Sequence, residues 1–96
     1  MKKERPITPG CVVRSKAGRD EGRRFIVIRE LDDDFVMVAN GDLRKMDRQK
    51  KKRRKHLKPT GEVVEAAAQR LAEGRPIEDC EVRTWLSEEE EKLVQV

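Results

Sequence analysis

The chain has 96 residues, of which 35% are hydrophobic and 44% are charged, and its formal net charge is +4. This length suits one small domain with a compact core. No apolar run approaches the ~20 residues of a membrane-spanning helix, and the basic start of the chain lacks the hydrophobic stretch of a signal peptide. We therefore expect a cytoplasmic protein that does not contact a membrane.

Short strands are predicted in the first half of the chain, over residues 11–15, 25–28 and 35–39, where β-branched and aromatic residues cluster. Residues 16–22 are a polar loop, and the acidic residues 32–34 mark a turn. Asn40-Gly41 suits a type I′ hairpin, which would return residues 43–46 as a fourth strand. Residues 56–58 could add a fifth. Five short strands with little to cover them predict a small barrel. Its expected core consists of Val13, Phe25, Val27, Val36, Val38 and Leu57.

Two short helices are predicted in the second half. Thr60 is the expected N-cap of the first, whose apolar residues follow at helical spacing until Gly74 stops it. The second is expected over residues 78–86, with Val82, Trp85 and Leu86 on its apolar face. The four consecutive glutamates of residues 88–91 repel one another, so we expect the chain to fray beyond Leu86.

The charge is distributed unevenly between these two halves. Residues 1–61 contain nineteen Lys and Arg against nine Asp and Glu, a net charge of +10, whereas residues 62–96 contain four against ten, a net charge of −6. A basic first part favours an anionic partner for it. We divide the chain into an N-terminal arm (1–8), a β-barrel (9–58) and an acidic helical appendage (59–96). The acidic tail either keeps the protein soluble or transiently covers the basic part.

Residues 10–42 resemble a KOW motif, the signature of SH3-like barrels in ribosomal proteins and NusG-type elongation factors. The matching segments are the strand 12–15, the loop 16–22, the strand 24–28 and the return 35–38. Residues 14–20 and 40–45 are similar in particular to short bacterial KOW-domain RNA-binding proteins related to large-subunit ribosomal proteins. Cys11 departs from the pattern, which would have a polar residue there. The resemblance implies a mainly β protein, a five-stranded SH3-like barrel followed by two short helices, that binds RNA.

Cations are concentrated between Arg44 and Lys58, where ten Lys and Arg accompany one acid, Asp47. Six adjacent positive charges, residues 50–55, are costly for a compact state unless an anion relieves them. Phosphates do so with release of counterions. A solvated loop, or contact with an anionic lipid surface, is the alternative. We expect RNA contacts from the barrel, its first loop and this run: Arg14, Lys16, Arg19, Arg23, Arg24, Arg44, Lys45, Lys50, Lys51, Lys52, Arg53, Arg54 and Lys55.

The aromatic residues indicate how RNA would be recognised. The chain has no Tyr, and Phe25, Phe35 and Trp85 all lie in apolar patterns, so we expect them in the core. Readers of single strands usually stack bases on exposed aromatics. Their absence favours recognition of phosphates and of folded RNA shape.

Catalysis and metal binding have little support. His56 is the only histidine and has no acidic neighbour in the sequence, and Cys11 and Cys80 form no CxxC pair. We expect two reduced thiols, buried or half-buried, no cofactor, no metal and no enzymatic activity.

The sequence therefore predicts a monomeric binder of structured RNA, ribosomal RNA or the ribosome in particular. A protein-interaction module of the transcription-elongation-factor KOW type, docking by its sheet edge, is the alternative, and non-specific DNA coating is a third hypothesis.

Overall fold

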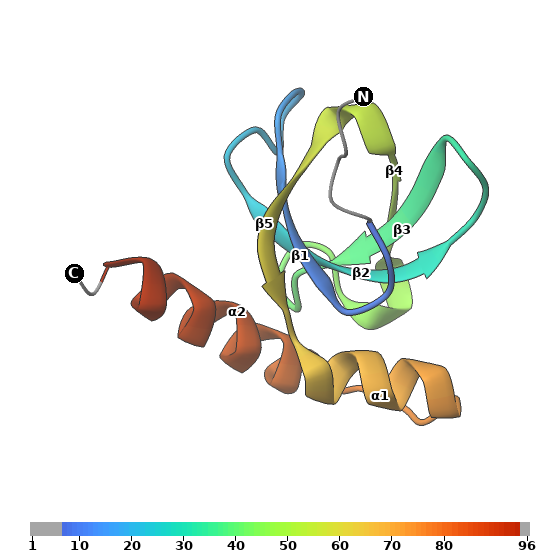
Figure 1. Ribbon diagram of the computed structural model, residues 1–96, viewed down its shortest axis with the longest axis vertical. Coiled ribbons are helices and arrows are strands. Elements are labelled where there is room, and N and C mark those ends of the chain that lie inside the picture. Colours follow the sequence, from blue (N-terminus) through green and yellow to red (C-terminus); the bar gives the residue numbers. More distant parts are fainter. Residues whose placement is uncertain (1–6, 95–96) are drawn as a thin grey trace.

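A computed structural model describes residues 7–94, which form a five-stranded antiparallel sheet followed by two helices (Figure 1). The strand order is β4-β3-β2-β1-β5, and the edge strands β4 and β5 are not paired with each other, so the sheet is not closed. Two short 3₁₀ helices, η1 and η2, flank β4. The elements are β1 (Cys11–Ser15), β2 (Arg24–Glu30), β3 (Phe35–Ala39), η1 (Met46–Arg48), β4 (Lys50–Arg53), η2 (Arg54–His56), β5 (Leu57–Val63), α1 (Glu65–Glu73) and α2 (Asp79–Val94).

The inner face of the curved sheet carries the predicted core. Side chains alternate between the two faces of a strand, so the residues that flank an inward-pointing valine point outward. All six residues expected in the core are at most 2% exposed and belong to one cluster, which confirms the prediction. The buried Cys11 joins them. The strands predicted over 11–15 and 35–39 are also confirmed, whereas β2 is longer at both ends than expected.

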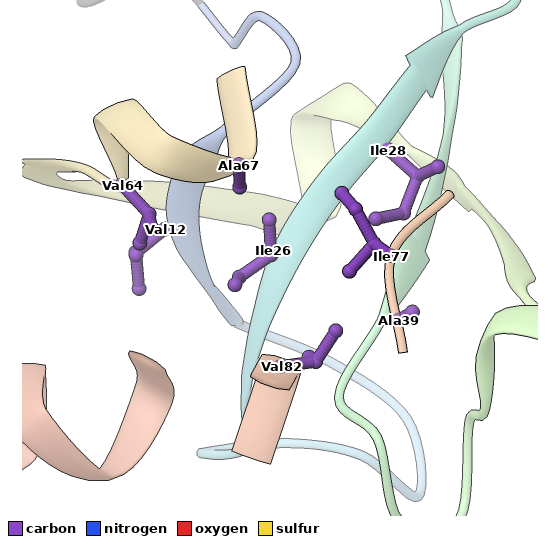
Figure 2. Packing of buried hydrophobic residues seen from close by; sticks show 8 residues of the cluster. All are labelled: Val12, Ile26, Ile28, Ala39, Val64, Ala67, Ile77 and Val82. Atoms are coloured by element: carbon purple, nitrogen blue, oxygen red, sulfur yellow. The ribbon is translucent and has the colours of Figure 1, made fainter. Parts of the chain in front are cut away.

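The outer face of the sheet packs against the helical segment, as Figure 2 shows. Val12 and Ile26 come from β1 and β2, and Ala67 and Val82 come from α1 and α2; all four are fully buried. Arg70 of α1 also forms an ion pair with Glu81 of α2. The helices and the sheet therefore share a hydrophobic core.

The fourth strand is not where the hairpin prediction put it. A type I′ turn needs positive φ at both central residues, but among the described residues positive φ occurs only at glycines, so Gly41 has it (76°) and Asn40 does not. Instead, the Asn40 side chain accepts hydrogen bonds from the backbone N–H groups of Asp42 and Arg44, at 3.0 and 2.9 Å. Residues 40–45 thus form a compact loop, and β4 begins only at Lys50.

Gly41 is the point where this loop meets α2. A Cβ atom there would lie 2.5 Å from the Asp79 carbonyl oxygen, and the Gly41 carbonyl accepts a hydrogen bond from Arg83 at 2.6 Å. We predict that Gly41→Ala costs about 2 kcal/mol of unfolding free energy, because it combines a left-handed conformation with a backbone clash. Urea unfolding measures this. Gly18→Ala is the control, because its φ is also positive and no atom lies within 4 Å of the added Cβ.

The first helix differs from the prediction at its start, and the second differs at its end. Thr60 is not an N-cap: it lies in β5 and its hydroxyl donates to the Val12 carbonyl, while α1 begins only after Val64. Gly74 does end α1, in the left-handed conformation. The end of the second helix at Leu86 is wrong, since α2 continues to Val94 and points away from β4 (Figure 1). No helix among residues 7–94 combines the length and apolarity needed to cross a membrane.

Candidate nucleic-acid interface

The six-residue basic run is not a solvated loop, because its first four residues form β4 and the rest lie in η2. Register pairs Lys52 with Val36 and Lys50 with Val38, two inner-face core residues. Lys51 and Arg53 instead pair with Met37 and Phe35, on the outer face. A strand of four cations thus presents alternate side chains to opposite environments.

The inward side chains of this run, Lys50 and Lys52, share one carboxylate, that of Asp20 in the β1–β2 loop. The Lys50 and Lys52 ammonium groups lie 3.2 and 3.6 Å from Asp20 Oδ2, and Lys52 Nζ also donates to Ser15 Oγ at 3.0 Å. Burial opposes ionisation of Asp20, but the Lys50 hydrogen bond and the charges of Lys50, Lys52 and Arg44 outweigh it and hold the pKa below its ordinary value. Lys52 is 8% exposed and unavailable to a ligand.

Arg54 also has a structural role. Its guanidinium forms an ion pair with Glu30 at 2.7 Å and donates to the carbonyl oxygens of Asp32 and Ile7. It thereby ties η2 to the β2–β3 turn, where the Asp32 carboxylate accepts the N–H groups of residues 34 and 35. Those two backbone hydrogen bonds, the strongest influence, hold the pKa of Asp32 below its ordinary value. Of the six cations, Lys51, Arg53 and Lys55 are left exposed.

A second group of cations lies on three neighbouring strands of the outer face. Arg14 of β1 is paired with Arg24 of β2 on one side and with Lys58 of β5 on the other. Arg14 and Lys58 are exposed, and neither forms an ion pair with a described residue. Arg24 is half-buried and donates to the Leu86 carbonyl of α2 at 3.4 Å.

The start of the β1–β2 loop joins this row to η2. The Lys16 backbone N–H donates to the His56 carbonyl at 2.8 Å. This hydrogen bond places the segment with Arg14 and Lys16 beside the segment with Lys55 and Lys58. Lys16, Arg19, Arg23 and Lys45 are exposed, whereas Arg44 is half-buried. Of the thirteen predicted contacts, the structure leaves these exposed: Arg14, Lys16, Arg19, Arg23, Lys45, Lys51, Arg53 and Lys55. Lys58 was not among the predicted contacts, because only the β1–β5 register places it opposite Arg14.

The aromatic residues divide between core and surface. Phe25 is fully buried as predicted, and Trp85 is half-buried against the helical core. Phe35 is also only half-buried, and Lys51 Nζ and Arg53 Cζ lie 4.4 and 5.1 Å from its ring centroid. The expectation that it would be a core residue is therefore wrong in part, because β3 places it on the outer face.

Both cysteines are free thiols, but they differ in environment. Cys11 is buried, as expected, and Cys80 is exposed on α2, which the prediction did not anticipate. Among residues 7–87, whose side chains the structure describes, no three His, Cys, Asp or Glu side chains are placed to hold a metal ion. Comparison of the sequence with protein-family models and with curated proteins finds no match.

Proposed function

We propose that this protein is a non-catalytic, monomeric binder of structured RNA, ribosomal RNA or the ribosome in particular. Phosphates would contact Arg14, Lys16, Lys55 and Lys58 around η2, with Lys51 and Arg53 beside them. The observation that carries the proposal is the cross-strand row of Arg14 and Lys58, which are directly opposite each other and both exposed.

Like charges on directly opposite residues destabilise a sheet, because their Cβ atoms are only about 5 Å apart. Neither Arg14 nor Lys58 forms an ion pair with a described residue, and the Asp20 and Glu30 carboxylates are paired with Lys50, Lys52 and Arg54. A phosphate placed over the row would satisfy two guanidinium or ammonium groups at once. Phosphate binding therefore removes a cost that the folded protein otherwise carries.

We also propose that the sheet is an SH3-like barrel of the KOW kind. Its curvature brings Lys52 of the edge strand β4 to Ser15 of β1, although the two strands are not neighbours. The 3₁₀ helix η2 spans the gap between β4 and β5 (Figure 1). The resemblance of residues 10–42 to the KOW motif agrees with this arrangement.

The test replaces only the exposed cations of the run. If the protein neutralises about six phosphates of an RNA hairpin, log Kd should rise linearly with the logarithm of the salt concentration, with a slope of roughly 4 to 5. The triple variant K51Q/R53Q/K55Q is expected to lower that slope by roughly 2 to 3, because binding releases fewer counterions when phosphate contacts are lost. Fluorescence anisotropy from 50 to 200 mM salt measures both values.

Two controls separate this effect from net charge. K51R/R53K/K55R keeps the charges and should keep the salt dependence, and Arg75→Gln removes an exposed cation of the α1–α2 connection and should change little. Duplex DNA of equal length should compete less well than the folded RNA. An unchanged salt dependence in the triple glutamine variant would reject this surface and favour a protein partner.

A further inference from the structure

The outer face of β3 and β4 carries an apolar row beside a cationic row. Phe35 and Met37 are half-buried and separated by one inward-pointing residue, so they follow each other on the same face. Arg53 is directly opposite Phe35, and Lys51 is directly opposite Met37. Both cations are exposed, and both lie within 5.1 Å of the Phe35 ring centroid.

The apolar row leads into a hollow of about 830 Å³ between the sheet, η1 and α1. Met37 lines it together with Met46 of η1 and Leu71 of α1, and Arg29 and Gln49 are among its polar lining residues. Arg29 is the β2 partner of Met37, so Met37 lies between two cations, Arg29 and Lys51. Its lining mixes apolar side chains with polar ones, Asp47 among them, and its volume lies within the range of about 300–1,000 Å³ that is usual for small-molecule sites.

Aromatic and apolar side chains next to a line of cations are the features with which proteins hold unpaired nucleotides. Bases stack on the aromatic rings, and the cations follow the phosphates. The Lys51 ammonium lies over the Phe35 ring in the free protein, and its flexible side chain can move to a phosphate when a base takes its place. Methionine adapts its shape to a flat ligand, which suits Met37 and Met46 to a second base.

We infer that this strip holds unpaired nucleotides of the bound RNA, with one base on Phe35, the next on Met37 at the mouth of the hollow, and their phosphates on Arg53 and Lys51. This inference rests on the proposed function and names the part of the RNA that the surface selects. It replaces the expectation that no aromatic is available for stacking.

The test compares two RNA hairpins that differ only in a three-nucleotide bulge containing 2-aminopurine. The bulged hairpin should bind more tightly, and stacking should change the 2-aminopurine fluorescence. Phe35→Leu keeps an apolar side chain but removes the ring, and is expected to weaken binding of the bulged hairpin about tenfold. Binding of the fully paired hairpin and the salt dependence should be unchanged. Phe35→Trp should retain the preference for the bulge.

Leu43→Ala is the matched control, because Leu43 is an exposed apolar residue (60%) in the loop before η1 and does not line the 830 Å³ hollow. Thermal unfolding of each variant shows whether it is folded. Equal binding of both hairpins with no effect of Phe35→Leu would overturn the inference while the RNA-binding proposal stands. If neither hairpin bound with an affinity that depends on salt, the proposed function itself would be rejected.

Discussion

Replacing Val82 by aspartate is expected to unfold the sheet and both helices together. Val82 of α2 is fully buried in the cluster that includes Ile26 of β2 and Ala67 of α1. An unpaired carboxylate there should lower the free energy of unfolding by about 4 kcal/mol or more, because the cluster around Val82 consists of apolar residues that cannot compensate its charge. For a domain of this size that loss lowers the melting temperature by on the order of 15–30 °C. Circular dichroism and the β2 amide signals in NMR spectra measure it.

Cys80→Asp provides the control, since Cys80 is exposed on the same helix and the substitution adds the same charge. It should change the unfolding free energy by less than about 0.5 kcal/mol. If V82D melted α2 but left the β2 amide signals and the sheet stability intact, the helices would be a separate appendage, and the shared core described above would have no energetic importance.

Asp20→Asn is expected to destabilise the protein by about 3 kcal/mol, because it leaves the buried Lys52 ammonium with Ser15 as its remaining partner among the described residues. Lys50 is one-third exposed and can turn to solvent. The double variant D20N/K52M removes both buried charges and should recover most of the loss. Urea unfolding of the two single variants and the double variant measures the coupling; strictly additive effects would show that this ion pair is not responsible.

The same carboxylate predicts the acid sensitivity of the protein. The pKa of Asp20 in the folded state lies below its ordinary value of 3.8, which is taken for the unfolded chain. The stabilisation from the ionised carboxylate is therefore fully present when the pH is above the unfolded-chain pKa. It is lost as the pH falls through the lower folded-state pKa. Wild-type stability should therefore decrease below about pH 4 more steeply than that of D20N. Parallel curves for the two proteins in this range would contradict the role given to Asp20.

Local patterns in the sequence determined much of the fold. Alternation of apolar residues identified the inner core, from Val13 to Leu57, because a strand with one buried face needs every second side chain to be apolar. Asp32 marked a turn because its side chain can accept nearby backbone N–H groups, as it does. Gly74 marked a helix end because glycine adopts positive φ without strain.

Tertiary structure decided the rest, above all the roles of the cations. Lys51 and Lys52 are identical neighbours in the sequence, yet one is exposed over Phe35 and the other is buried beside Asp20. Asp20 belongs to a distant loop, so only the curvature of the sheet brings it to β4. The same holds for Arg14 and Lys58, which become neighbours through the β1–β5 register. Charge density along the chain is a property of the sequence, but the partner of each charge depends on contacts between residues that are far apart in it.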